Sequence, residues 1–291
     1  MSSRPSDLVR LAVPNKGRIA GPVREILGKS GLHPEGDGRQ LIAPTRDPLV
    51  EILLARPADI PEYVASGVAD LGITGLDLVR ERGAEVQELL DLQVGKARLV
   101  VAVPEESKGR GLAGLAGARI ATEFPSITRD YFGEQGIVIS VVPVGGACEV
   151  TPHLGIAEAI VDLTASGETL RTHNLREIAE ILATSARLFG NVDSCRRKKG
   201  KVGEIRVALE SVVRARGQCY LMMNVRRPAL GRVKKILPGL SGPTVMEVAS
   251  SEDLVAVHAV VEEDRIYRLI SLLKKAGARD ILVMPIDRMV R

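Results

Sequence analysis

The order of apolar and polar positions along the chain predicts an α/β fold. Over the first two thirds of the sequence, short runs rich in Val, Ile and Leu alternate with segments of helical periodicity, which is typical of parallel sheets whose strands are connected by helices. We predict strands at Leu8–Val13, Glu51–Leu54, Leu71–Ile73, Leu99–Val103, Arg119–Ala121, Val138–Val142 and Ala159–Leu163, with Ala186–Asn191 as a return strand. We predict helices at Ala20–Ser30, Ile60–Ser66, Leu76–Glu81 and Ile127–Gln135.

The last part of the chain, residues 216–291, predicts a separate small domain. It follows a helix predicted at Val202–Arg216 and repeats the order βαββαβ, which is the ferredoxin-like unit. Its elements are expected at Cys219–Val225, Pro228–Leu237, Thr244–Ala249, Leu254–Val261, Asp264–Ala276 and Asp280–Ile286. Modules of this kind commonly bind effectors or mediate assembly.

Length and hydropathy make this a globular chain rather than a membrane protein. The 291 residues are 45% hydrophobic, which is enough to bury a large core in two or three domains. No apolar run approaches the ~20 residues that span a bilayer, and the start lacks the apolar core of a secretory signal. We therefore expect a cytoplasmic protein with no membrane partner.

The net charge and the side-chain composition limit the classes of molecule that the chain is expected to bind. The net charge of +4 is mild, and four Tyr, three Phe and no Trp leave little for base stacking, so we expect no nucleic-acid partner but anionic small substrates. Three widely spaced cysteines and four unclustered histidines indicate neither a disulfide framework nor a metal site. The basic stretch Cys195–Lys201 is read as a solvated surface turn, with a phosphate-binding patch as the alternative.

The run Ala157–Leu170, AEAIVDLTASGETL, has the pattern of a phosphate pocket. An apolar strand carries Asp162 near its carboxyl end and continues through small residues into a helix expected from Leu170. Backbone N–H groups at such a turn converge on an anion, and a preceding carboxylate suits sugar hydroxyls. The segment therefore favours a ribose 5-phosphate cradle, although an ordinary capped strand–turn–helix connection remains open.

Two further turns follow predicted strands. Lys16 and Arg18 of the loop NKGR come after the first strand, where the carboxyl edge of a parallel sheet opens into a crevice. That position suits a polyphosphate, and a solvated loop is the alternative. Asp70, Thr74 and Gly75 of DLGITG belong to a second strand-end turn, which by itself is equally consistent with a simple turn.

Several ordered motifs resemble the ATP phosphoribosyltransferase family. They include LAVPNKGRI, ARPADIPEYVASGVADLGITGLDLV, ATEFPSITRDYF, GGACEVTPHLGIAEAIVDLTASGETLRTHNL and RARGQCYLMMNV. The later stretch LKKAGARDILVMPI is similar to the regulatory domain of the long form of that family. The resemblance implies a two-domain, periplasmic-binding-protein-like α/β core, with residues 1–97 and 174–200 as the first domain, residues 98–173 as the second, and residues 216–291 as the regulatory domain.

The resemblance also implies an activity. The family joins ATP to 5-phosphoribosyl 1-pyrophosphate (PRPP) with Mg²⁺, giving N1-(5-phosphoribosyl)-ATP and pyrophosphate, in the first step of L-histidine biosynthesis. L-Histidine inhibits the long form, which assembles as homo-dimers and hexamers. Because adenine N1 already carries a lone pair, the reaction needs alignment and charge stabilisation rather than a His or Cys nucleophile.

Residue roles follow from the same resemblance. Asp162 and Glu149 would hold the ribose hydroxyls and stabilise positive charge on the sugar. The remaining implied contacts fall into three sets: Thr164, Ala165, Ser166, Gly167, Glu168 and Thr169 for the 5-phosphate; Lys16, Gly17, Arg18, Asp70, Thr74 and Gly75 for the nucleotide and pyrophosphate; and Leu240, Thr244 and Val283 for histidine. The ligands of the metal are left unassigned.

The predicted phosphate loop departs from the family pattern at Glu168, and the usual Ser-Thr pair appears as Ala165-Ser166. Glu168 stands where relatives usually carry an uncharged residue, and a carboxylate beside a phosphate is unfavourable unless it points away or helps to hold magnesium.

Two other functions compete with the enzyme. One is a solute-binding module and the other is a regulatory protein whose core only transmits a signal, and release of pyrophosphate from ATP and PRPP discriminates the enzyme from both.

Overall fold

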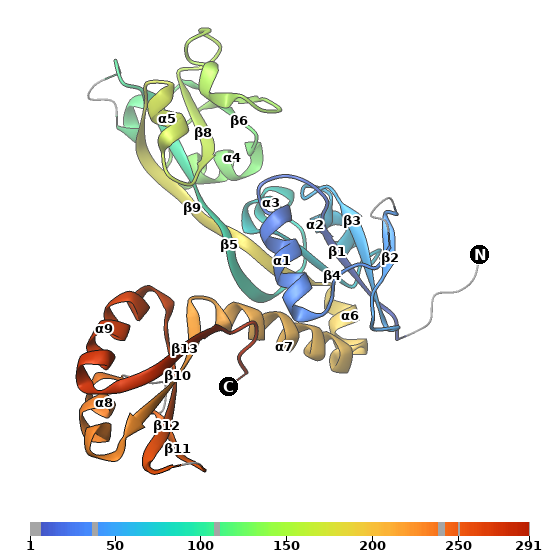
Figure 1. Cartoon of the computed structure of the whole chain (residues 1–291). Coiled ribbons are helices and arrows are strands. Elements are labelled where there is room, and N and C mark those ends of the chain that lie inside the picture. Colours follow the sequence, from blue (N-terminus) through green and yellow to red (C-terminus); the bar gives the residue numbers. More distant parts are fainter. Residues whose placement is uncertain (1–6, 37–39, 108–110, 238–241, 250, 291) are drawn as a thin grey trace. The chain divides into compact units, whose positions relative to one another are not determined.

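The chain divides into two compact units, Met1–Leu209 and Glu210–Arg291. The computed structural model describes residues 7–36, 40–107, 111–237, 242–249 and 251–290, and Figure 1 traces the chain through its elements. The predicted α/β class is confirmed. The division of the first unit into residues 1–97 with 174–200 and residues 98–173 stays a prediction.

In the described part of the first unit, the strands form one sheet in the order β2-β3-β1-β4-β9-β5-β8-β6-β7. One end holds the parallel strands β1 (Val9–Pro14), β3 (Val50–Ala55) and β4 (Leu71–Gly75), with β2 (Ile42–Pro44) antiparallel at the edge. Helices α1 (Ala20–Ser30), α2 (Ile60–Ala65) and α3 (Leu76–Arg82) connect them. Strands β1 and β4 are buried on both faces along almost their whole length, which explains their mostly apolar sequences.

The other end of the sheet holds a second group of parallel strands. These are β8 (Ala159–Thr164), β6 (Arg119–Thr122) and β7 (Ser140–Pro143). They are accompanied by helices α4 (Pro125–Glu134) and α5 (Glu168–Thr172), and by 3-10 turns at Leu112–Leu115 and Cys148–Val150. One cluster packs Phe132 and Leu115 against one face of these strands, and another packs Cys148 and Leu170 against the opposite face.

Two long antiparallel strands, β5 (Gln87–Pro104) and β9 (Leu175–Gly190), join the two groups (Figure 1). β9 pairs with β4 at one end, and β5 pairs with β8 at the other. Their mutual register shifts several times between Glu88 and Ala102. At Gly95 the backbone has a φ of +59°, and a Cβ there would lie 2.4 Å from Cγ2 of Ile19, so only glycine lets β5 approach the start of α1.

A carboxylate from one strand group also contacts a helix of the other. Glu81 of α3 accepts hydrogen bonds from the backbone N–H groups of Ser126 (2.9 Å) and Ile127 (3.1 Å) at the start of α4. The first N–H groups of a helix have no partner within the helix and attract negative charge. Together with Pro125 in the first turn, Glu81 explains where α4 begins.

The interpretation of Cys195–Lys201 as a solvated turn is correct in part: Arg196, Arg197, Lys199 and Gly200 are exposed, but most of the segment is helical. The segment runs from α6 (Val192–Arg197) into α7 (Lys199–Ala215), and the Asn191 side chain caps α6 by accepting from the N–H of Ser194. Lys198, between the two helices, is packed because its Nζ donates to Asp70 Oδ1 (2.8 Å) and to the carbonyl of Leu8 (2.6 Å). A run of charged residues is usually solvated, but a charged side chain that has a buried partner, as Lys198 has in Asp70, can itself be buried.

The second unit has the predicted ferredoxin-like order. Its elements are β10 (Gln218–Arg226), α8 (Leu230–Ile236), β11 (Thr244–Val248), β12 (Ser251–Glu262), α9 (Ile266–Ala276) and β13 (Ala278–Pro285), with 3-10 turns at Arg227–Ala229 and Glu263–Arg265. The described strands pair antiparallel in the order β11-β12-β10-β13. Leu221, Val257 and Leu273 belong to a core of its own, so a separate C-terminal sheet domain is confirmed. Within the described ranges, no helix combines the length and apolar character needed to cross a bilayer.

Candidate active site

The predicted phosphate loop lies between β8 and α5 and is held at both ends. Thr164 and Leu170 are buried, whereas Ala165, Ser166, Glu168 and Thr169 are exposed. Within the turn, the N–H of Gly167 donates to Oγ1 of Thr164 (2.9 Å). Gly167 has a φ of +74°, a conformation that favours glycine. The helix starts at Glu168 rather than at the expected Leu170, and Glu168 is exposed to solvent, which is compatible with a carboxylate that points away from a bound phosphate.

Asp162 stands among carboxylates at the end of β8. Its pKa is raised to about 6, chiefly by burial, against a hydrogen bond from the N–H of Leu163 (2.7 Å) that lowers it; the negative charges of Glu149 and Glu123 also contribute to the rise. Glu149 lies in the 3-10 turn Cys148–Val150, with its Oε1 3.9 Å from Nε2 of His173. The structure thus brings Asp162 and Glu149 into one negative region, which suits positive charge on a substrate.

Cys148 lies in the same region and is not activated. Burial raises the pKa of its thiol to about 12, and the negative charges of Asp162, Glu123 and Glu149 contribute to this shift. At neutral pH the sulfur therefore stays protonated. Because the thiolate is the nucleophilic form of cysteine, the residue is a structural thiol.

The loop Lys16–Arg18 lies between β1 and α1, exposed to solvent. Arg18 reaches across to β5, where its Nη1 donates to the carbonyl oxygens of Gly95 (2.8 Å) and Lys96 (3.2 Å). At the carboxyl end of β4, Thr74 is fully buried and its hydroxyl donates to the carbonyl of Pro57 (2.9 Å). Gly75 follows it as the N-cap of α3.

The structure does not bring Asp70 together with Thr74 and Gly75, and its part in substrate binding stays a prediction. Asp70 precedes β4 at the amino end, whereas Thr74 and Gly75 lie at the carboxyl end, roughly 13–16 Å away along an extended strand. Its Oδ1 accepts from Lys198 Nζ, and its Oδ2 accepts from the N–H of Arg10 (2.8 Å). Asp70 as a whole residue is 2% exposed, so these contacts lie in the interior of the fold.

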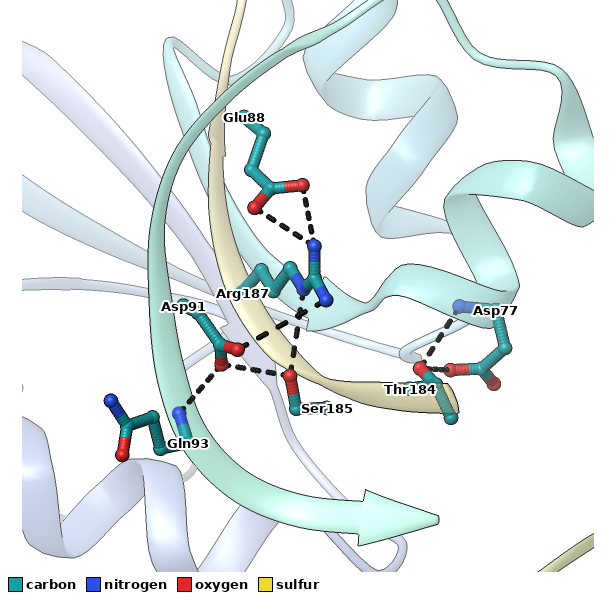
Figure 2. Close-up of polar contacts among 7 residues, drawn as sticks. All are labelled: Asp77, Glu88, Asp91, Gln93, Thr184, Ser185 and Arg187. Atoms are coloured by element: carbon teal, nitrogen blue, oxygen red, sulfur yellow. Dashed lines mark hydrogen bonds and ion pairs between the residues drawn. The ribbon is translucent and has the colours of Figure 1, made fainter. Parts of the chain in front are cut away.

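A polar network connects α3 with β5 and β9 (Figure 2). The Thr184 hydroxyl donates to Oδ1 of Asp77 (2.6 Å) and accepts from the N–H of Asp77 (3.2 Å). The Ser185 hydroxyl donates to Oδ1 of Asp91 (2.7 Å). Arg187 donates to both carboxylate oxygens of Glu88, at 2.9 and 2.8 Å. These hydrogen bonds therefore connect side chains of α3, β5 and β9 along the paired part of the two long strands.

This network forms one wall of a hollow of about 330 Å³. The hollow contains Ala165 of the phosphate loop, Lys96, whose carbonyl binds Arg18, and Thr184, which binds Asp77 just after Gly75. It is lined by Asp91, Lys96, Ala97, Arg98, Ala165, Ala183, Thr184, Ser185 and Arg187. Of the residues predicted to bind substrate, Ala165 lines this hollow, whereas Arg18 only forms a hydrogen bond to a lining residue, as does Asp77 of α3. A larger hollow of about 690 Å³, between α3, α4 and β9, contains none of the predicted site residues.

Sequence reasoning missed most of the side chains that line the smaller hollow. Asp91, Arg98, Ser185 and Arg187 lie on β5 and β9, for which only Leu99–Val103 and Ala186–Asn191 were predicted as strand. A usable signal exists, because Arg98 directly precedes an apolar strand and Arg187 interrupts one. Charged residues in such positions seldom occur without a partner.

In the second unit, the residues expected to bind histidine are not all described, and those that are lie apart. Leu240 lies outside the described residues. Thr244 begins β11 and Val283 lies on β13, at opposite edges of the sheet. Three strand spacings separate these edges, roughly 14 Å. A histidine site built from both residues of one copy stays a prediction.

Comparison with known proteins decides the family. The family model described as ATP phosphoribosyltransferase matches residues 56–211, which is more than half of the chain. The chain belongs to the ATP phosphoribosyltransferase family. A model of the family's C-terminal domain matches residues 215–288, which confirms the long form. The predicted enzyme class, a pentosyltransferase, is confirmed with it.

Relatives match over almost the whole length. The ATP phosphoribosyltransferase of Methanosarcina barkeri is 50% identical over 289 residues, covering 97% of this chain and all of the relative. That of Methanocella arvoryzae is 52% identical over 285 residues, covering 98% of this chain and all of the relative. A solved ATP phosphoribosyl transferase (HisG:HisZ) complex from Thermotoga maritima contains a chain that is 31% identical, with a TM-score of 0.62, over 70% of this chain and 99% of that one.

Proposed function

We propose that the chain transfers the phosphoribosyl group of PRPP to N1 of ATP, with release of pyrophosphate, as the first step of histidine biosynthesis in the cytoplasm. Family membership supports the reaction class. The observation that carries the assignment to this site is the hollow of about 330 Å³, where the phosphate loop meets strands that contact the Arg18 loop and α3. A sugar pyrophosphate and a nucleotide require adjoining anion sites of this kind.

The phosphate loop is proposed to hold the 5-phosphate of PRPP. Its exposed residues surround a turn whose backbone is set by the Gly167–Thr164 hydrogen bond, and convergent N–H groups in such turns bind anions. Lys16 and Arg18 are proposed to bind the pyrophosphate or the triphosphate, because both are exposed cations on a loop that reaches the edge of the same hollow.

Asp162 and Glu149 are proposed to bind the ribose hydroxyls and to stabilise the transition state. As the C1–O bond breaks, its electron pair leaves with pyrophosphate and positive charge develops on the sugar, while the N1 lone pair forms the new bond. A preorganised negative region lowers the energy of that charge without reorganisation during the reaction. The raised pKa of Asp162, about 6, leaves it ionised at neutral pH, so no proton transfer from it is needed.

Magnesium fits this site as a companion of the substrates. Asp162, Glu149 and Glu123 supply the carboxylate oxygens that Mg²⁺ prefers, and their charges act on one another. In the ranges that the structure describes, however, no three metal-ligating side chains are close enough to hold an ion by themselves. We therefore propose that substrate phosphate oxygens supply most ligands and these carboxylates the rest. The ion would neutralise negative charge on the leaving pyrophosphate.

Histidine is proposed to bind the second unit and to inhibit from there. The argument rests on the C-terminal domain match at residues 215–288 and on the separate core of that unit. A homo-oligomer is proposed as the active assembly, and the name of the Thermotoga relative records an assembly for that protein. A chain that ends at Arg214 is expected to lose histidine binding in calorimetry, whereas binding of unchanged affinity by that shortened chain would contradict the assignment.

The central experiment measures pyrophosphate release when ATP and PRPP are mixed with the full chain. We expect release that requires both substrates and Mg²⁺, and that falls when histidine is added without competition against PRPP. Release abolished by Asp162→Asn but retained in a variant of the remote pair Arg119–Glu158 would tie the activity to this site. Tight binding of either substrate without any release would instead indicate a solute-binding module.

A further inference from the structure

Arg98 shares one sheet face with the predicted phosphoribosyl site. In the antiparallel pair of β5 and β8, Arg98 lies opposite Thr164, and Val100 lies opposite Asp162. Residues directly opposite one another point to the same face, and diagonal neighbours lie roughly 7–8 Å apart, within reach of long side chains. Arg98 therefore projects from the face that carries Asp162 and the first residue of the phosphate loop. Arg98 and Ala165 both line the hollow of about 330 Å³.

Two carboxylates of β9 hold the Arg98 guanidinium. Nη1 and Nη2 donate to the two oxygens of Glu177 (2.5 and 2.9 Å), and Nη1 also donates to Oε2 of Glu180 (3.1 Å). Because two carboxylates face one cation, a negative charge is left over on β9. The three side chains are 39%, 32% and 43% exposed, and ion pairs that are this accessible contribute little net stability. The guanidinium can therefore change partners at small cost.

We propose that Arg98 is a substrate-binding residue that exchanges its contacts with Glu177 and Glu180 for phosphate oxygens of PRPP. The proposal rests on the function proposed above and adds a residue to it. A guanidinium matches phosphate and carboxylate by the same two-pronged geometry, so the glutamates hold the side chain in a conformation close to the one that phosphate requires. The substrate must be anionic to compete with them, which gives Arg98 a part in selecting the pyrophosphorylated sugar.

The chain offers a matched control in Arg119. This residue forms the same kind of pair with Glu158, with Nη2–Oε1 at 2.6 Å and Nε–Oε1 at 3.1 Å, and is 47% exposed. It begins β6, and Glu158 directly precedes β8. The pair thus lies at the amino ends of these strands, whereas the phosphate loop follows the carboxyl end of β8. The Arg119 variant therefore shows the effect of losing an exposed Arg–Glu pair alone, without the loss of a residue that binds substrate.

The test compares Arg98→Gln, Arg98→Lys, Glu177→Gln and Arg119→Gln in the full chain. Arg98→Gln is expected to raise the KM for PRPP on the order of 10- to 100-fold, the loss of charge-assisted hydrogen bonds, with the KM for ATP changed less than about threefold. Arg98→Lys should rescue little because an ammonium cannot form the paired contacts. Glu177→Gln should leave the KM for PRPP equal or lower, since it removes the competing carboxylate, and Arg119→Gln should leave it unchanged.

The decisive signature is a raised KM for PRPP in Arg98→Gln together with a KM that is not raised in Glu177→Gln. A purely structural ion pair would impair both variants alike, and equal KM values for Arg98→Gln and Arg119→Gln would overturn the proposal. Calorimetry of Arg98→Gln with inorganic pyrophosphate and with ribose 5-phosphate shows which phosphate Arg98 binds. If the affinity for neither ligand falls, the proposal is overturned as well. These probes report on Arg98 even if the wild-type chain releases no pyrophosphate from ATP and PRPP, an outcome that would instead contradict the proposed function.

Discussion

Lys198 and Asp70, which are 128 positions apart, form a salt bridge of 2.8 Å with side chains only 10% and 3% exposed. Asp70 precedes β4 at the interior of the first sheet, and Lys198 connects α6 to α7. The pair therefore fastens the segment after β9 to the amino end of the sheet. Its burial indicates a contribution to stability, and neither residue lines the hollow of about 330 Å³.

Removal of one partner should be costly. Lys198→Met leaves the Asp70 carboxylate buried without its counter-ion, and we expect a loss of about 3–5 kcal/mol in the free energy of unfolding, measured by urea denaturation. Arg265→Met, which removes the exposed pair with Glu262 (65% and 51% exposed), should cost less than about 1 kcal/mol. The activity per folded molecule should survive in both variants. A Lys198→Met protein that is fully stable but inactive would instead support a role of Asp70 in the active site.

Asp162→Asn should abolish most catalysis while binding ATP nearly normally. The substitution removes negative charge beside the reacting sugar, and loss of one electrostatic stabiliser typically lowers kcat by ~10²-fold or more. In the wild-type chain, kcat should fall as the pH drops through about 6, where Asp162 becomes protonated. Glu149→Gln should move this limb of the pH profile to lower pH, because the Glu149 charge raises the pKa of Asp162. An unchanged turnover number in Asp162→Asn would contradict its assigned role.

The same substitution should stabilise the fold at neutral pH. The folded-state pKa of Asp162, about 6, lies above its ordinary value of 3.8, so between these values the folded state binds more protons and its stability falls as the pH rises. Above pH 6 the full cost is present, at most about 3 kcal/mol for a shift of about two pKa units. The melting temperatures of Asp162→Asn and wild type should therefore be similar near pH 4, diverge as the pH rises to about 6, and differ by a constant amount above it. A difference that is independent of pH would contradict the raised pKa.

Gly167→Val should raise the KM for PRPP far more than the KM for ATP. Gly167 has a φ of +74°, and a new Cβ would lie 3.4 Å from Nη1 of Arg171, so a β-branched side chain strains the turn and fills the space that the phosphate approaches. Gly136 is a matched control, since its φ is +68° and nothing lies within 4 Å of an added Cβ. Gly136→Val should carry a similar backbone strain, on the order of 1–2 kcal/mol, without a change in either KM. Equal effects of Gly167→Val on both substrates would indicate general misfolding.

Local patterns determined the elements whose burial is uniform along their length. β1, β4 and β8 are buried on both faces, so they were predicted as apolar runs to within one or two residues at each end. The second unit was predicted element by element because alternation along β10 and β12 matches a sheet covered on one face. The phosphate loop was predicted for a similar reason, since its glycine and small residues serve a turn formed within six residues.

The tertiary structure decided the features that depend on distant pairing. β5 and β9 extend far beyond their predicted cores, because segments such as Arg176–Glu180 place polar side chains on a half-exposed strand whose register shifts interrupt simple alternation. Asp70 and Lys198 looked like a loop ligand and a solvated charge until the fold buried them together. Arg98 acquired its position beside Thr164 and Asp162 only through the β5–β8 register. Periodicity reports how a segment meets its immediate surroundings, whereas the partners of a charged side chain are set by which strands become neighbours, and that choice is made by the packing of the whole sheet.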